Sequence, residues 1–253
     1  MEILSIVNQK GGVGKTTTCI NLAASLSTTK RRVLLVDLDP QSNATKGCGI
    51  NSSDVISSIN ELLLKRCKFT DTVRHLQSFS FDVLPATPQL TESEVMLLTS
   101  EKKEYVLKDI LLNSNLTYDY ILIDCPPSLN ILTVNALTAS TGVIIPVQCE
   151  YFALQGLSEL VNTIDTIKKS SNQSIQIKGI IRTMFDSRNN LSNDVSNQLI
   201  KYFKQKLFKT KIPRNITVAE SPSHGMPVTV YDPSSKGSLA YLSLTGEILK
   251  QEI

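Results

Sequence analysis

Residues 9–18 of this 253-residue chain read QKGGVGKTTT, and this stretch decides the fold. The apolar run ILSIV at residues 3–7 comes directly before it and predicts a buried strand. Apolar side chains at helical spacing over residues 15–27 predict a helix directly after it. A strand, a glycine-rich turn and a helix in this order form a phosphate cradle, because backbone N–H groups and the positive helix end face one point. The stretch therefore predicts a phosphate-binding loop.

Individual residues of this loop indicate a nucleoside triphosphate bound with Mg²⁺. Lys15 can reach the β- and γ-phosphates, and the Thr16 hydroxyl can ligate the metal. The common G-x-x-x-x-G-K-[ST] pattern places glycine at position 9, but Gln9 stands there and a second lysine, Lys10, follows it. The residues expected to contact the nucleotide are Lys10, Gly11, Gly12, Val13, Gly14, Lys15, Thr16 and Thr17.

Length and composition fit one domain over residues 1–253. No apolar stretch approaches the ~20 residues of a membrane span. The strand before the loop begins at the N-terminus, so we expect no signal peptide and no N-terminal accessory domain. The five cysteines form no C-x-x-C pair, and two histidines cannot build a zinc site alone. We therefore expect a reduced, cytoplasmic protein.

Strand-like and helix-like segments alternate along the chain. Apolar runs typical of buried strands lie at residues 3–7, 33–36, 81–84, 120–123, 143–147 and 175–183. Helical patterns lie at residues 15–27, 105–112, 130–138, 154–168, 192–208 and 238–249. The alternation predicts an α/β fold, a mostly parallel twisted sheet with helices on both faces. Residues 47–99 are more polar and less regular, and we expect an excursion of short helices and loops there.

Aspartates follow two of the predicted strands. Asp37 and Asp39 come at the end of the second strand, and Asp124 closes the fourth. Ligands of open α/β sheets bind at the carboxyl ends of the strands, where Mg²⁺ needs oxygen ligands and an attacking water needs an acceptor. We expect a metal site of Thr16, Asp39 and Asp124, in which Asp124 contacts the ion through a coordinated water. We also expect Asp39 to orient the attacking water and Asp37 to assist at the metal. A turn-starting role is the alternative for Asp39, since Asp-Pro also begins turns.

Basic charge is concentrated late in the chain. The net charge is +3, but residues 163–214 hold eleven Lys and Arg against three Asp, a local charge of +8. Such a segment indicates a polyanionic partner, and a set of solvated helix faces is an equally good interpretation.

Three motifs together resemble the deviant Walker A ATPases of the ParA/Soj/MinD superfamily, which share the P-loop NTPase fold. They are KGGVGKT at residues 10–16, DLDPQ at 37–41 and DCPP at 124–127. Four later motifs look specifically like the ParA/Soj branch, namely TMFD at residues 183–186, IPRN at 212–215, SPSHG at 221–225 and YDP at 231–233. The resemblance covers nearly the whole chain and implies the short type, without an N-terminal helix-turn-helix domain.

The resemblance implies a weak, Mg²⁺-dependent ATPase that forms an ATP sandwich dimer. In the family, the lysine that matches Lys10 crosses the dimer interface and touches the phosphates of the partner subunit. A bound triphosphate keeps excess negative charge facing outward, and a cation from a second subunit would stabilise it. The implied catalytic residues are Lys10, Lys15 and Asp39. Pro213 and Asn215 match the segment that lines the adenine.

The resemblance also implies that the ATP-bound homodimer binds double-stranded DNA without sequence preference. A ParB-like centromere-binding protein would stimulate hydrolysis and release the dimer, so the implied location is the cytoplasm, on the nucleoid and not on a membrane. Arg188 matches a DNA-contacting arginine, and Lys201 and Lys204 fit the same basic surface, whose binding should weaken steeply with salt. Family members typically read Arg-Asn-Val-Arg where this chain ends the motif with Thr217, so one basic contact is missing.

Three other functions stay open on the sequence. A MinD-like membrane-cycling ATPase that positions division machinery would need a basic amphipathic tail, and residues 238–249 lack that pattern. An enzyme resembling the nitrogenase iron protein would need two cluster cysteines per subunit, whereas Cys125 directly follows Asp124. A regulator that binds ATP to recruit other proteins, with little turnover, fits the same motifs.

Overall fold

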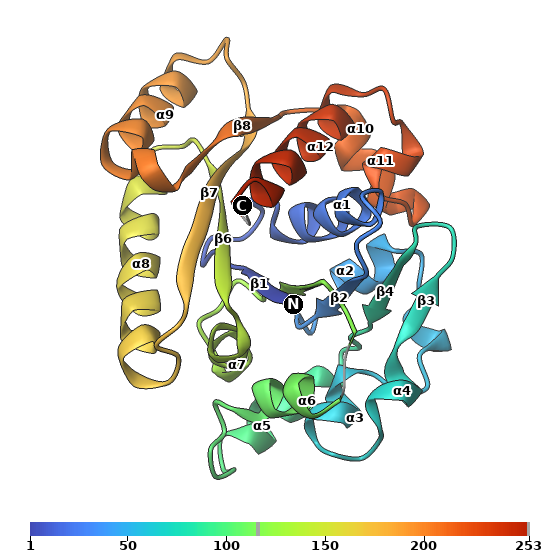
Figure 1. The fold of residues 1–253 in the computed structure, drawn as a ribbon. Helices are drawn as coiled ribbons and strands as arrows, with labels where there is room; N and C mark the ends of the chain where they lie inside the picture. Colours follow the sequence, from blue (N-terminus) through green and yellow to red (C-terminus); the bar gives the residue numbers. More distant parts are fainter. Residues whose placement is uncertain (115–116, 252–253) are drawn as a thin grey trace.

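A single eight-stranded sheet organises the part of the chain that the computed structural model describes, residues 1–114 and 117–251 (Figure 1). Its strand order is β3-β4-β2-β5-β1-β6-β7-β8. All neighbouring strands pair in parallel except β3 and β4, which are antiparallel. The strands are β1 (Glu2–Ile6), β2 (Val33–Asp37), β3 (Arg74–Leu76), β4 (Phe81–Leu84), β5 (Tyr120–Asp124), β6 (Gly142–Gln148), β7 (Gln176–Phe185) and β8 (Leu207–Pro213). The predicted mostly parallel sheet is confirmed.

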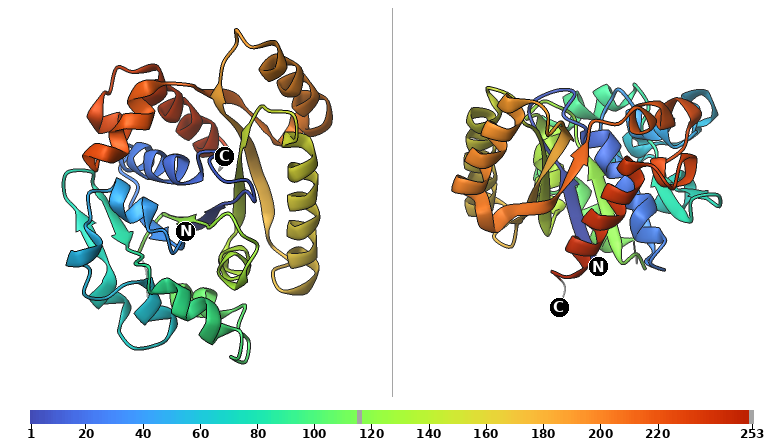
Figure 2. Two further views of the ribbon diagram at one scale, coloured as in Figure 1. Left: turned by 180° about the vertical axis from the view of Figure 1, so that it is seen from behind. Right: turned by 90° about the horizontal axis from the view of Figure 1, so that it is seen from above.

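Helices cover both faces of the sheet, as predicted (Figures 1 and 2). One apolar cluster packs α1 (Lys15–Ser27), α2 (Asn43–Gly47), α11 (Val228–Tyr231) and α12 (Lys236–Leu249) against one face. A second cluster packs the other face, with α3 (Ile59–Leu63), α5 (Leu90–Leu97), α6 (Val106–Asn113), α7 (Ile131–Ala139), α8 (Ala153–Ser170) and α9 (Asn190–Phe203). The shorter elements are η1 (Ser52–Asp54), α4 (Phe69–Thr72), η2 (Lys204–Lys206), α10 (Ile216–Glu220) and η3 (Ser221–His224).

Register places the predicted functional residues at one edge of the sheet. On β5, Asp124 lies opposite Ile6 of β1 on one side and opposite Asp37 of β2 on the other. The loop between β1 and α1 leaves the sheet at the same edge. The carboxyl ends of the three central strands therefore bring together the loop and both aspartate motifs, as expected of a ligand site in an open parallel sheet.

Two details of the predicted secondary structure are wrong. The helix predicted over residues 192–208 ends at Phe203, and residues 207–213 form edge strand β8 instead. Apolar residues at 195, 199, 203 and 207 continue the helical spacing, whereas the strand is fixed by pairing with β7 and by the Glu247 carboxylate, which accepts from the Thr210 N–H at 2.6 Å. Residues 47–99 contain short helices, as expected, but also the unpredicted strand β3.

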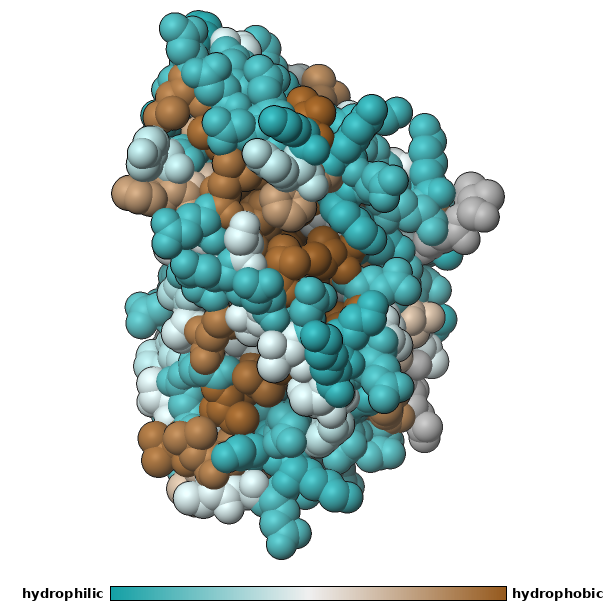
Figure 3. All heavy atoms as spheres, turned by 90° about the vertical axis from the view of Figure 1, so that its left-hand side faces the viewer, coloured by the Kyte–Doolittle hydropathy of each residue, from teal (hydrophilic) through white to brown (hydrophobic). Residues whose placement is uncertain are grey.

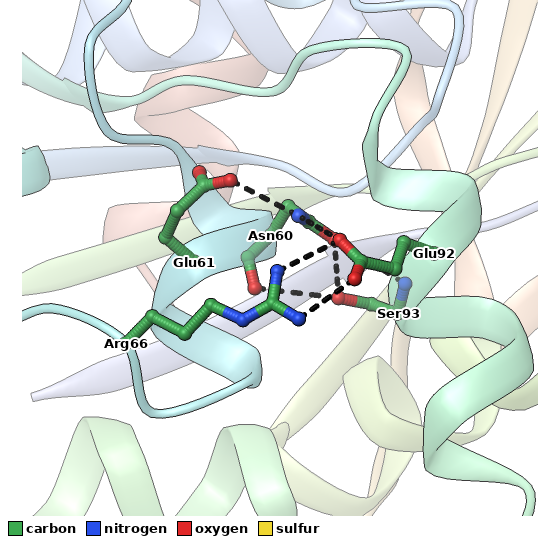
Figure 4. Close-up of polar contacts among 5 residues, drawn as sticks. All are labelled: Asn60, Glu61, Arg66, Glu92 and Ser93. Carbon is green, nitrogen blue, oxygen red and sulfur yellow. Dashed lines mark hydrogen bonds and ion pairs between the residues drawn. The ribbon is translucent and has the colours of Figure 1, made fainter.

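Side chains in and beside α3 and α5 join the two ends of that excursion to each other through a polar cluster (Figure 4). The buried Asn60 donates to Glu92 at 3.2 Å and accepts from the Ser93 hydroxyl at 2.7 Å. Arg66 pairs with the same Glu92 carboxylate at 2.7 and 2.9 Å, a two-pronged contact that fixes both side chains. These contacts hold α3 and α5 together in a segment whose hydrophobic pattern is irregular.

Close packing between β7 and β8 predicts a stability effect at Gly179. A β-carbon added there would lie 2.3–2.8 Å from three ring atoms of the buried Phe208, so the ring must shift. We expect Gly179→Ala to lower the free energy of unfolding by about 1–3 kcal/mol, measured by urea denaturation. Gly246→Ala in α12 is the matched control, because it meets no atom within 4 Å and should be neutral or slightly stabilising. Equal stability of the two variants would contradict the packing described.

Candidate nucleotide-binding site

The loop between β1 and α1 has the backbone shape of a phosphate cradle. Gly12 and Gly14 take positive φ angles of 73° and 86°, a region that favours glycine. Helix α1 starts at Lys15 with no capping side chain and no acidic residue in its first turn, so its N–H groups remain available to an anion. The Val13 carbonyl accepts a hydrogen bond from the Thr183 hydroxyl at 2.8 Å, which fastens the loop to the end of β7.

Lys15 is a buried cation without an ion-pair partner among the described residues. Lys15 is only 7% exposed to solvent, and its Nζ donates to the Lys10 backbone carbonyl at 3.1 Å. Burial lowers the pKa of this ammonium, while the nearby Asp124 and Asp39 oppose the shift. A buried charge is stabilised by a close counter-ion, and phosphate oxygens entering the loop would supply one.

Asp124 and Thr16 form the polar floor of the loop. The Thr16 hydroxyl donates to Asp124 Oδ2 at 2.7 Å, and Asp124 Oδ1 is buried without a hydrogen-bond partner. Burial, reinforced by the neighbouring Asp37, raises the pKa of the Asp124 carboxyl well above its usual range. An unpartnered buried oxygen beside a hydroxyl fits a cation such as Mg²⁺, which takes few protein ligands and keeps phosphates and waters as the rest. No group of three or more His, Cys, Asp or Glu side chains suited to a metal occurs in residues 1–114 and 117–251.

The two aspartates after β2 have different surroundings. Asp37 accepts from the Thr45 backbone N–H at 2.8 Å and from the Thr45 hydroxyl at 2.6 Å, and burial raises its pKa to about 6. Both Asp37 oxygens are engaged, because the other accepts from the Asp39 N–H at 3.2 Å. Asp37 therefore anchors α2, which does not match the assisting metal role expected for it. Among the described residues, the Asp39 carboxylate accepts only from the Gln41 N–H, at 2.9 Å, and Asp39 lines the cavity described next.

A cavity of about 510 Å³ opens in front of the loop, a size usual for small-molecule sites. Asp39 lines it on one side, and Pro213 and Asn215 line it from the segment where β8 runs into α10. The Asn215 side chain also caps α10 by accepting from the Val218 N–H at 3.1 Å. The cavity thus joins the predicted loop, the predicted water-orienting aspartate and the predicted adenine segment. Its loop residues are Gly11, Gly12, Gly14, Lys15, Thr16 and Thr17.

Comparison with known proteins identifies the family. The AAA domain family model matches residues 1–177. The sporulation initiation inhibitor protein Soj of Bacillus subtilis (strain 168) is 49% identical over 98% of each chain. The chromosome partitioning protein ParA of Myxococcus xanthus (strain DK1622) is 48% identical over 99% of this chain and 89% of its own length. The chain belongs to the ParA/Soj family of partitioning ATPases. The family predicted from the motifs is thereby confirmed.

The fold of this ParA/Soj family member also matches solved P-loop NTPase structures. A structure of cobyrinic acid a,c-diamide synthase from Mycobacterium smegmatis, with bound ATP analog and magnesium, has a TM-score of 0.87. It is 34% identical, and the match covers 100% of this chain and 96% of that one.

Three of the residues predicted for the nucleotide and metal site lie outside the cavity of this ParA/Soj chain. Val13 is buried beneath the loop, and Asp124 lies behind Thr16. Lys10 lines a neighbouring cavity instead, where it pairs with Glu150. Two cavity residues were not predicted as site residues. Thr183, at the end of β7, begins the TMFD motif but was given no role, and Tyr241 of α12 lies outside every motif.

Among the predicted DNA-binding residues, Arg188 precedes α9, Lys201 lies in it and Lys204 follows it. Helix α9 lies on the left of Figure 1, and Figure 3 shows the molecule from that side. Hydrophilic side chains dominate this side, with apolar patches between them (Figure 3). The Arg188 side chain is 88% exposed and pairs with Asp186 at 2.8 Å, which lowers the pKa of that carboxyl to about 2. Lys201 lies in α9 over the Tyr202 ring, and Lys204 starts η2.

The exposed charge of residues 163–214 is smaller than the sequence count indicates. Arg182 is buried and donates to the Ser196 hydroxyl at 3.0 Å and the Phe208 carbonyl at 2.7 Å. Lys178 pairs with Glu2 at 2.7 Å. Arg182 and Lys178 are engaged within the domain, and Arg188 pairs with Asp186, so fewer than eleven cations of this region are unpaired.

Proposed function

We propose that the chain is a DNA-partitioning ATPase that binds ATP with Mg²⁺ and closes as an ATP sandwich dimer. The observation that carries the proposal is the cavity that unites the phosphate loop, Asp39 and the segment of Pro213 and Asn215. The buried, unpartnered oxygen of Asp124 supports a cation beside it. The relatives named Soj and ParA, close to half identical over nearly the whole chain, support partitioning as the process served.

The chain's own residues divide the chemistry between them. Lys15 and the free N–H groups of α1 neutralise the phosphates and hold them for in-line attack. Thr16 and Asp124 would hold Mg²⁺, the latter through a coordinated water, and the bound ion supplies charge neutralisation between the β- and γ-phosphates. Asp39, two residues beyond β2, would orient the attacking water and could also share in the metal site.

Dimer closure and DNA release complete the proposed cycle. Lys10 of each subunit would reach the phosphates bound by the other, so closure would depend on the γ-phosphate. The closed homodimer would hold double-stranded DNA on basic residues around α9 and release it when a ParB-like partner stimulates hydrolysis. We place this cycle in the cytoplasm, on the nucleoid.

The surroundings of α12 argue against the MinD-like alternative. Tyr241, Leu244 and Ile248 of this helix are buried in the cluster shared with α1, so its apolar side is already covered. A membrane-binding helix needs that side free to enter the lipid. Among residues 1–114 and 117–251, no helix is long and apolar enough to cross a bilayer. A Pyrococcus furiosus MinD structure shares the fold at 24% identity, which shows the fold alone.

ATP-dependent retention of DNA tests the proposal. The chain with ATP and Mg²⁺ should retard a double-stranded fragment of arbitrary sequence, and with ADP it should not. A purified ParB-like partner should raise ATP turnover and shorten retention. Equal retention with ATP and ADP would contradict the proposed switch.

The proposed DNA surface predicts the effect of a charge reversal. We expect Arg188→Glu to weaken ATP-dependent DNA retention at every salt concentration, and to reduce the slope of log affinity against log salt by about 1–2 per subunit. The measurement is fluorescence anisotropy of a labelled duplex over a salt series. Lys68→Glu is the matched control, because Lys68 is an exposed lysine beside α4, near the opposite edge of the sheet. An unchanged slope in Arg188→Glu would move the DNA surface elsewhere.

A further inference from the structure

The side chain of Lys10 is bound within its own subunit. Its ammonium forms an ion pair with the Glu150 carboxylate, and the two side chains are 47% and 44% exposed. The pair lines a cavity of about 440 Å³ that adjoins the nucleotide cavity, since Met184 and Arg214 line both. Lys10 therefore lies at the rim of the nucleotide site and points away from it, toward the end of β6.

Both ends of this ion pair have fixed backbones. The Lys10 N–H donates to Asn8 Oδ1 at 2.9 Å, and Asn8 in turn donates to the Pro146 carbonyl of β6 at 2.7 Å. Glu150 lies in the turn before α8, where its carbonyl accepts from the Ala153 N–H at 3.0 Å. These contacts fix the backbone at both residues, so the two side chains meet between the loop and the end of β6.

The other acid of this cavity is already engaged. Asp186 accepts from Arg188 Nε at 3.0 Å and Arg188 Nη2 at 2.8 Å. Arg214, also at the cavity wall, is a cation and repels Lys10. Glu150 is therefore the carboxylate that holds Lys10 in the described part of the chain.

We propose that Glu150 is a positioning residue that holds Lys10 in the open subunit and opposes closure of the dimer. This inference rests on the proposed function, in which Lys10 must reach the phosphates of a second copy of the chain. One ammonium cannot keep its contact with Glu150 at full strength while it binds phosphate across an interface. Closure must therefore break two such pairs, one in each subunit, and the triphosphate must outcompete both carboxylates. ADP offers less negative charge, so the ion pair helps to keep the ADP state open.

The test is the dimer dissociation constant of Glu150→Gln with a slowly hydrolysed ATP analogue and Mg²⁺, measured by sedimentation. The glutamine keeps the size of the side chain and removes its charge. Exposed ion pairs contribute modestly, so for two pairs we expect a dissociation constant about threefold to tenfold below wild type. Glu159→Gln is the matched control, because it removes an equal charge from an exposed position on α8 and should leave the constant unchanged.

A double-mutant cycle with Lys10→Ala separates this inference from the function on which it rests. With Lys10 removed, Glu150→Gln should have no further effect on dimerisation. If Lys10→Ala fails to dimerise but Glu150→Gln alone dimerises like wild type or more weakly, Glu150 does not oppose closure and the inference is wrong. If Lys10→Ala dimerises as well as wild type, both the proposed role of Lys10 and the inference are overturned.

Discussion

Lys15→Ala is expected to weaken ATP binding by about 100-fold or more, because charge-assisted hydrogen bonds to the phosphates are lost. The Lys15 ammonium is buried, lacks an ion-pair partner among the described residues and has a pKa lowered by burial. Burying this charge therefore costs free energy when no ligand is bound, and phosphate is the ligand that the loop geometry favours. Calorimetric titration with ATP and Mg²⁺ measures the change.

The control for this variant is Lys250→Ala, which removes an exposed lysine after α12 and should bind ATP like wild type. Lys15→Ala should also fold at least as stably as wild type without nucleotide, since it removes a desolvated charge. Tight ATP binding by a folded Lys15→Ala protein would show that the nucleotide does not sit in this loop.

Asp39→Ala is expected to lower ATP turnover by about 100-fold or more while leaving ATP affinity within a few-fold of wild type. The carboxylate lines the nucleotide cavity, and its residue is 7% exposed. Its one hydrogen bond in the described structure is accepted from the Gln41 N–H, which leaves an oxygen free for water. Turnover is measured as phosphate release at saturating ATP, with and without the stimulating partner.

Asp39→Asn distinguishes the two roles that Asp39 could have. Asparagine still accepts a hydrogen bond from water but does not take its proton, so partial activity would indicate orientation and full loss would indicate a base. Asp54→Ala, which changes an exposed acid in η1, is the control for the lost charge. Wild-type turnover in Asp39→Ala would refute the assignment of Asp39 to hydrolysis.

The loop and the two aspartate motifs were predictable because they depend on local rules. A strand, glycines and a helix lie within residues 3–27, and parallel strands bring their carboxyl ends to one edge whatever the rest of the chain does. Register at that edge then sets Asp37 beside Asp124 without further information. The sheet and its helical layers follow from the same alternation.

Contacts between distant segments were not predictable from single-sequence patterns. The Thr183 hydroxyl supports the loop carbonyl of Val13 across 170 positions, and Tyr241 reaches the cavity from the last helix. Glu150 follows β6 in a turn that carries no recognised motif. Its contact with Lys10 is known only from the folded structure. Strand β8 was missed because packing against α12 and pairing with β7 override a helical spacing.

The molar mass of Asp39→Ala in solution tests the central claim most directly, because this variant should bind ATP and not consume it. Light scattering with ATP and Mg²⁺ should give twice the 27.9 kDa mass of one chain, and with ADP it should give one chain. Combining Lys10→Ala with Asp39→Ala should restore the single-chain mass in ATP. A single-chain mass for Asp39→Ala at saturating ATP would contradict the account of an ATP-closed dimer.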